Sequence, residues 1–249
     1  GSLLEGDGGF LVYVQMSPVT PEGIAGLEAA GATIVHVSEQ YQVVTAAMNP
    51  GTILPAAEVA TVSFMSPALE PRVARMPRTV ATQEVGTEAA PCPTGVWVSE
   101  GDTQLKAALA RSNFGVDGTG VKIGILSDSF DKKTSPTSWA GDVAAAELPG
   151  STNPCGYLTD VQNLKDHSGA DEGRAMAQAI HDLAPGAQLA FRTAFDGEFA
   201  FADYIRKLRF EDHADVIVDD VGYFDEPFFQ DGPVAVAVND VVADGAVYF

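Results

Sequence analysis

The sequence predicts an α/β protein in which a small α+β unit precedes a doubly wound parallel sheet. After residue 103, short and almost continuously apolar runs alternate with segments of helical period. Such runs are typical of strands that helices cover on both faces of a parallel sheet. The 249-residue chain is 46% hydrophobic, which suffices for a sizeable core.

Residues 10–68 form the smaller unit of this prediction. Strand and helix signals follow the order β-α-β-β-α-β, which is the ferredoxin-like split βαβ arrangement. We expect two helices, at Pro21–Ala30 and Ile53–Val59, and four strands, at Phe10–Val14, Thr33–Val37, Tyr41–Ala46 and Thr61–Met65.

A proline-rich segment without sustained periodicity, residues 69–100, follows and is interpreted as a linker or an exposed processing segment. The predicted domains are therefore residues 1–72, a linker of residues 73–101, and residues 102–249. Cys92 and Cys155 both lie beside prolines in loop-like sequence. A disulfide between them is favoured if the protein is extracellular, and the sequence leaves their pairing open.

The larger unit begins with a helix at Gln104–Arg111 and a glycine-rich turn. The helix predicted at Glu172–Leu183 has apolar residues at helical spacing and ends before Pro185-Gly186. The other helices are expected at Glu198–Arg209 and Val234–Ala243, and the strands at Val121–Leu126, Gln188–Phe191, Asp215–Val218 and Ala246–Phe249.

The composition limits the partners. A formal net charge of −20 disfavours nucleic acid and anionic membrane surfaces, because both would repel the protein. No apolar run approaches the roughly 18 residues of a membrane-spanning helix. Two cysteines without clustered histidines do not form a metal-binding pattern.

Acidic residues gather at one predicted edge of the larger sheet. Asp128 follows the first strand, Glu172 opens the next helix, and Asp219-Asp220 ends the third strand. Each alone is explained by a capped loop or by the helix dipole. Because ligands bind at the carboxyl ends of such strands, the three features together predict a cleft in which at least one carboxyl group has a raised pKa.

Residues 115–131 and 168–249 resemble subtilisin-like serine peptidases, and residues 10–68 resemble the inhibitory propeptide that precedes them. The segment Gly118–Ser129 is similar to the family's strand with the catalytic aspartate, which the resemblance places at Asp128. Phe130 stands where the family usually has a glycine.

Glu172 stands where the family's helix begins with the catalytic histidine. The related sedolisins have a glutamate there as general base, and the following Ala184–Ala187 is similar to theirs. Their aspartate four residues later is Met176 here. The resemblance thus implies a Ser-Glu-Asp triad, with Glu172 as base and Asp128 orienting it or sharing its proton.

Three histidines are alternative candidates for the base. His181 is half a helical turn out of phase with Glu172, and His213 precedes the third strand, at the opposite edge of the sheet. His167, in the loop before the helix, is the remaining candidate.

The segment Ile217–Tyr223 resembles the strand that pairs with extended substrate. It implies substrate contacts at Asp220, Val221 and Gly222, where glycine lets a chain approach closely. Either Asp219 or Asp220 is expected to contact Glu172. The family's Gly-Thr-Ser-x-Ala motif is missing from this sequence, and the last predicted strand reaches Phe249. We therefore expect the serine in a remainder of the catalytic domain beyond Phe249.

The sequence accordingly predicts a secreted or cell-surface serine endopeptidase proenzyme that acts on polypeptides. Its propeptide would place the linker in its own substrate cleft. The alternative is a non-catalytic pseudoprotease that serves as a binding or scaffold module. No cofactor is required. Structural calcium is common in the family and carboxylates suit it, but no EF-hand-like spacing occurs and no metal ligand is assigned.

Overall fold

The computed structural model describes residues 2–73 and 92–249, and these form two compact units. Of the described residues, the first unit comprises 2–73, Ala194–Lys207 and Val221–Asp244, and the second comprises 92–193, Leu208–Asp220 and Gly245–Phe249. Most of the predicted linker, residues 74–91, lies outside the described residues.

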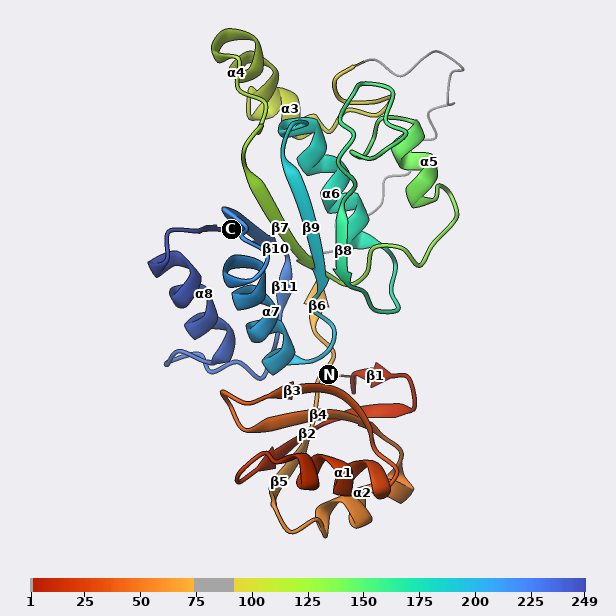
Figure 1. The fold of residues 1–249 in the computed structure, drawn as a ribbon, viewed down its shortest axis with the longest axis vertical. Coiled ribbons are helices and arrows are strands. Elements are labelled where there is room, and N and C mark those ends of the chain that lie inside the picture. Colours follow the sequence, from red (N-terminus) through yellow and green to blue (C-terminus); the bar gives the residue numbers. More distant parts are fainter. Residues whose placement is uncertain (1, 74–91) are drawn as a thin grey trace. The chain divides into compact units, whose positions relative to one another are not determined.

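The first unit contains an antiparallel sheet (Figure 1). Its strands follow the order β1-β2-β4-β3, and β5 pairs with β2 as well. Two helices, α1 (Pro21–Ala29) and α2 (Pro50–Ala57), accompany the sheet. The strands are β1 (Glu5–Gly6), β2 (Gly9–Met16), β3 (Thr33–Ser38), β4 (Val43–Met48) and β5 (Val62–Pro67). All the strand and helix segments predicted in residues 10–68 are present, with ends that differ by a few residues.

Both helices begin at side-chain caps followed by proline. Thr20 accepts a hydrogen bond from the amide of Gly23, and Asn49 accepts one from Gly51. Proline at the first helical position has no amide hydrogen to satisfy, so it suits this place. Local chemistry therefore sets where α1 and α2 begin.

Successive apolar side chains of β2 point to opposite sides, so both faces of the sheet are apolar. Val12 and Val14 pack in one cluster with Leu27 of α1 and Ala56 of α2. Leu11 and Tyr13 pack in a second cluster, which includes Phe195 and Phe199. Successive strand residues point to opposite faces, so β2 contributes to both.

In the second of these clusters the sheet packs against α7 (Glu198–Phe210). The residues of α7 up to Lys207 belong to this unit. The Tyr13 ring meets Phe199 edge-on at 5.0 Å between centroids, and its hydroxyl accepts a hydrogen bond from the Glu198 amide at 2.7 Å. His36 contacts Asp203 at 2.8 Å. This unit also holds α8 (Pro233–Ala243) and a two-stranded ladder of β6 (Arg72–Val73) and β11 (Val221–Gly222).

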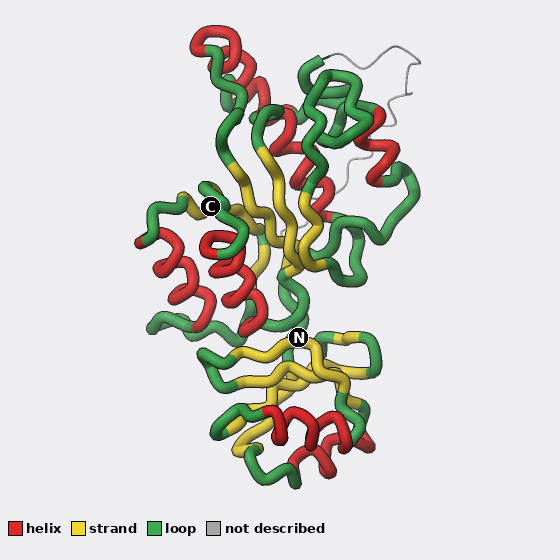
Figure 2. Tube along the Cα trace, in the orientation of Figure 1, coloured by secondary structure: helices red, strands yellow, loops and turns green. Residues whose placement is uncertain are grey.

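The second unit is built on a five-stranded parallel sheet in the order β12-β10-β7-β9-β8 (Figure 2). The helix α6 (Glu172–Leu183) packs on β7 and β9, while Leu208 at the end of α7 packs on the other face at Gly124. The strands are β7 (Lys122–Ser127), β8 (Gln162–Lys165), β9 (Gln188–Thr193), β10 (Val216–Asp219) and β12 (Val247–Tyr248). This is the mixed α/β architecture with a parallel sheet that the sequence predicts.

Three elements of this unit differ from expectation. The helix predicted at Gln104–Arg111 is interrupted at Lys106, whose φ of 60° separates α3 (Glu100–Gln104) from α4 (Ala107–Phe114). The strand β8 and the helix α5 (Trp139–Ala144) were not predicted, because neither carries an extended apolar period. No helix among the described residues is long and apolar enough to cross a membrane.

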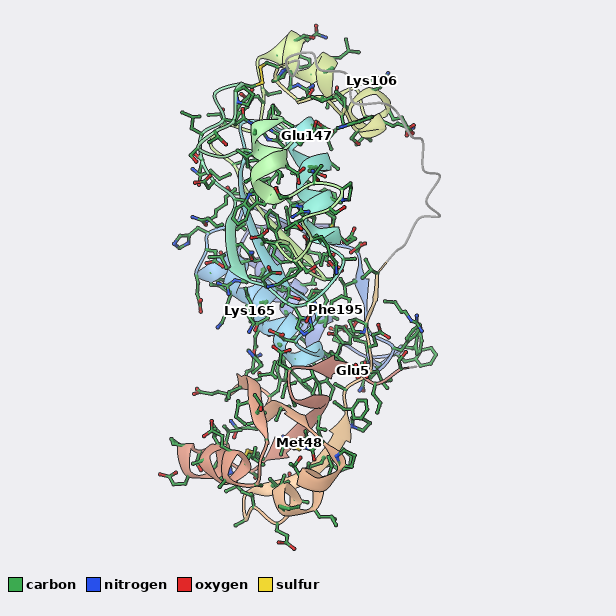
Figure 3. All side chains as sticks on the ribbon, turned by 90° about the vertical axis from the view of Figure 1, so that its right-hand side faces the viewer. Glu5, Met48, Lys106, Glu147, Lys165 and Phe195 are labelled. Atoms are coloured by element: carbon green, nitrogen blue, oxygen red, sulfur yellow. A yellow bond between two sulfur atoms is a disulfide. The ribbon has the colours of Figure 1, made fainter. Side chains whose placement is uncertain are left out.

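Cys92 and Cys155 form a disulfide, with 5.3 Å between their Cα atoms. The segment after Cys92 is also held by Glu147, which is labelled in Figure 3. The carboxylate of Glu147 accepts hydrogen bonds from the amides of Val96 and Trp97, at 2.7 and 2.8 Å. Burial raises the pKa of Glu147 to about 7.

Candidate functional site

The Asp128 carboxylate caps the beginning of α6. It accepts hydrogen bonds from the amides of Ala170 and Glu172, at 2.6 and 2.9 Å, and from the amide of Ser129. The first amides of a helix have no partners within the helix, so a buried carboxylate at this end satisfies them. Asp128 therefore joins the end of β7 to the start of α6.

Two glycines permit this close packing. A Cβ at Gly169 would lie 2.6 Å from Asp128 Oδ2, and a Cβ at Gly173 would overlap a ring carbon of Phe191. Neither position has room for a side chain. Glycine before and inside the first turn of α6 thus lets the helix approach β7 and β9.

Asp171 fixes the loop that follows Asp128. Its φ is 60°, and its carboxylate accepts hydrogen bonds from the amides of Lys132 and Lys133, the shorter at 2.7 Å. It also forms an ion pair with Arg174, at 3.0 Å. In the same loop Phe130 is fully buried, with its ring 5.4 Å from that of Phe191. The phenylalanine at the position where the family usually has glycine thus belongs to the core.

Glu172 lies beside this cap with its side chain partly buried. The Ser127 hydroxyl donates a hydrogen bond to its carboxylate Oε2. Burial raises the pKa of Glu172, and the charge of Asp128 raises it further, whereas hydrogen bonds with Ser127 and Asp220 oppose the rise. Glu172 is therefore a stronger base than an ordinary carboxylate.

Asp220 is the aspartate of the Asp219-Asp220 pair that interacts with Glu172. Burial, followed by the charges of Glu172 and Asp219, raises the pKa of Asp220 to about 7. The hydrogen bond between the two side chains raises the pKa of Asp220 further and opposes the rise in the pKa of Glu172. Asp219 instead accepts a hydrogen bond from the Tyr248 hydroxyl.

The arrangement follows from the register of the sheet. Leu126 of β7 pairs with Asp219 of β10, so the residues just after these two strands lie at one edge. The sequence predicted that Asp128, Glu172 and Asp220 share this edge. It did not single out Ser127, although a hydroxyl residue directly before Asp128, at the end of β7, was a visible signal.

The histidines lie in other surroundings. His181 is fully buried on α6 with its ring 5.4 Å from Tyr157, and burial lowers its pKa to about 4. The Nδ1 of His167 lies 2.9 Å from the carbonyl oxygen of Ser168. His213 precedes β10 in an exposed position with φ of 60°. In the described ranges, no three or more metal-ligating side chains gather into a group that could hold an ion.

The strand β11 begins directly after Asp220. Val221 pairs with Val73 and Gly222 pairs with Arg72, in antiparallel register. A Cβ at Gly222 would meet no described atom within 4 Å, so this pairing does not itself demand a glycine.

The fold is similar to that of a solved serine protease. The structure is similar to that of a mutant of EpiP, the epidermin leader peptide processing serine protease from Staphylococcus aureus. The TM-score is 0.50 and the identity 12%, over 95% of this chain and 59% of that one. At this identity the likeness shows the fold alone.

Two further solved structures are similar at a lower score. Fervidolysin from Fervidobacterium pennivorans, a keratinolytic enzyme related to subtilisin, has a TM-score of 0.45 at 13% identity, over 100% of this chain and 40% of that one. A second EpiP structure has 0.45 at 12% identity, over 96% and 58%. The chain thus spans between 40% and 59% of these proteins. No protein-family model and no curated protein matches the sequence.

Proposed function

We propose that this chain is the N-terminal part of a serine endopeptidase proenzyme whose general base is Glu172. The observation that carries the proposal is the position of Glu172, held by the Ser127 hydroxyl beside Asp128 at the first turn of α6. A base works best when its pKa lies near the working pH, and the surroundings of Glu172 move its pKa in that direction.

In this mechanism the serine lies in the whole protein beyond Phe249. Ionised Glu172 takes the proton of the serine hydroxyl as the oxygen attacks the peptide carbonyl, and later returns it to the leaving amine. Asp128 holds the backbone of Glu172 in place, and its negative charge favours the protonated form of that base. Asp220 positions the carboxylate by sharing a proton with it.

Residues 1–72 are proposed to be a ferredoxin-like inhibitory propeptide. The strand pairing of the first sheet, in which β2 lies between β4 and β5, supports this role. The ladder of β6 with β11 supports it as well, because a strand bound at β11 would occupy the place of a substrate. The Cys92–Cys155 disulfide supports a secreted or cell-surface location, where disulfides persist.

The proposal is tested on the whole protein. A fluorophosphonate probe should label the serine, and Glu172→Gln should abolish labelling and peptide hydrolysis. Glu100→Gln, at the beginning of α3, is the matched control and should leave both unchanged. We expect an acidic pH optimum. A pH–rate profile that peaks above about pH 8 would contradict a carboxylate base.

The second candidate is a pseudoprotease that binds polypeptides without cleaving them. It is favoured by the described surroundings of Glu172, which contain carboxyl and hydroxyl groups where the family has an imidazole. Extending the reading frame past Phe249 separates the two candidates, because a pseudoprotease needs no Gly-Thr-Ser motif. Failure of the probe to label the whole protein would favour this candidate.

A further inference from the structure

The ladder of β6 and β11 places one basic side chain next to an aromatic ring. Arg72 of β6 is paired with Gly222, two residues before Phe224. Its guanidinium carbon lies 5.9 Å from the centroid of the Phe224 ring. This distance is within the range of a cation–π contact, in which the negative face of the ring attracts the cation.

The ring is available to such a cation. The Phe224 side chain is 62% exposed, so no core packing accounts for its position. Arg72 is exposed as well. Gly222, the residue paired with Arg72, has no side chain, and no described atom lies within 4 Å of the place where its Cβ would be. An arginine in the paired strand can therefore extend over the ring without displacing another group.

The sequence that follows Phe224 is acidic. Asp225 and Glu226 follow it directly, and the whole chain has a formal net charge of −20. A guanidinium group is planar and weakly hydrated, so it stacks on an aromatic face better than an ammonium group does. The site thus suits arginine first and lysine second.

We propose that Phe224 is a specificity-determining residue that receives a cationic side chain, preferably arginine, from the substrate residue paired with Gly222. Arg72 occupies this subsite from within the chain. The proposal rests on the proposed function, because it takes β11 as the strand that binds substrate. It adds the substrate class: polypeptides with a basic residue at one defined position.

The first test uses the 249-residue chain and needs no catalysis. Hydrogen exchange followed by mass spectrometry reports how often β6 leaves β11. Phe224→Leu and Arg72→Gln should each increase the exchange rate of the peptide that contains Arg72 and Val73 by roughly two- to fivefold. This is the change expected when an exposed cation–π contact is lost. The double variant should show no further increase, because both changes remove the same contact.

Phe229→Leu is the matched control for this experiment. Phe229 lies in the same loop and is fully exposed, at 102% of its reference area. Its replacement should leave exchange unchanged, and Arg72→Lys should fall between the wild type and Arg72→Gln. Exchange that is unaffected by Phe224→Leu, or effects that add in the double variant, would overturn the contact.

The second test uses the whole protein and paired peptides that carry arginine or its neutral isostere citrulline at successive positions. At one position kcat/KM should be roughly two- to fivefold higher with arginine, and Phe224→Leu should bring the ratio close to one. Cleavage without preference at any position overturns the subsite and leaves the protease intact. Absence of all cleavage refutes the proposed function. In that case hydrogen exchange still tests whether Arg72 contacts Phe224, but not whether substrate binds there.

Discussion

The amide of Glu172 donates a hydrogen bond to Asp128 Oδ1 at 2.9 Å, while the side chain of Glu172 is held by Ser127. Asp128 thus acts on Glu172 through the backbone and through its charge. Asp128 sets where the helix begins, and its charge also raises the pKa of Glu172, whereas the hydrogen bonds with Ser127 and Asp220 oppose that rise.

Asp128→Ala should destabilise the 249-residue chain by about 2–3 kcal/mol, because it leaves the buried amides at the start of α6 without an acceptor. Asp128→Asn retains one oxygen acceptor, so its loss of stability should be about half as large. Urea unfolding measures both. Asp131→Ala is the control: its side chain is 48% exposed and its ion pair with Arg174 is long, at 3.9 Å, so it should cost less than about 1 kcal/mol. Equal losses for Asp128→Ala and Asp131→Ala would contradict the cap.

Ser127→Ala should raise the pKa of Glu172 further. The Ser127 hydroxyl donates to the carboxylate, which stabilises the ionised form, so its removal favours the protonated form. Carbon-detected NMR titration of the Glu172 carboxyl group measures the shift directly. Thr193→Val is the control, because it removes a nearby hydroxyl that donates to the carbonyl oxygen of Asp128. It should leave the pKa of Glu172 unchanged. A lower pKa in Ser127→Ala would exclude this role.

Glu198→Gln should change how stability depends on pH. Glu198 is 5% exposed, and burial, with the charges of Asp225 and Glu226, raises its pKa from 4.5 to about 8. Between these values the folded protein keeps a proton that the unfolded chain has lost. The free energy of unfolding therefore falls with rising pH, by about 1.4 kcal/mol per pH unit for one proton.

In Glu198→Gln this contribution disappears, so the variant should gain stability relative to the wild type from pH 5 to pH 8. Urea unfolding at several pH values measures the difference. The exposed Glu28, replaced by glutamine, should not alter the slope. Parallel curves for Glu198→Gln and the wild type would show that Glu198 ionises normally in the fold.

Reduction of the Cys92–Cys155 disulfide should lower the stability of the chain by roughly 4 kcal/mol, because the bond closes a loop between residues 63 apart in sequence. Thermal unfolding with and without dithiothreitol measures the loss. The variant with serine at both positions should unfold like the reduced wild type and should not respond to the reductant. A melting temperature of the wild type that is insensitive to complete reduction would refute the prediction.

Much of the site could be predicted because it depends on local patterns. The bounds of α6, Glu172–Leu183, follow from an apolar period and a terminating Pro-Gly. The carboxyl ends of parallel strands meet at one edge, which places Asp128, Glu172 and Asp220 together.

The remaining details depend on register and on distant pairing. Successive strand residues face opposite sides, so the choice between Asp219 and Asp220 depends on the pairing of Asp219 with Leu126, which no local pattern specifies. The pairing of Arg72 with Gly222 joins segments that are far apart in sequence. The hydroxyl of Ser127 reaches Glu172 only once α6 is docked.

The ladder between β6 and β11 also affects how readily the chain aggregates. A strand edge with free backbone groups can pair with the same edge of another molecule and begin an aggregate. Arg72 and Val73 cover one edge of β11 from within the same chain. Proteolytic removal of β6 would leave that edge open, and light scattering should then detect self-association that rises with protein concentration. Arg72 and Val73 thus shield this edge of β11 from pairing with another copy of the chain.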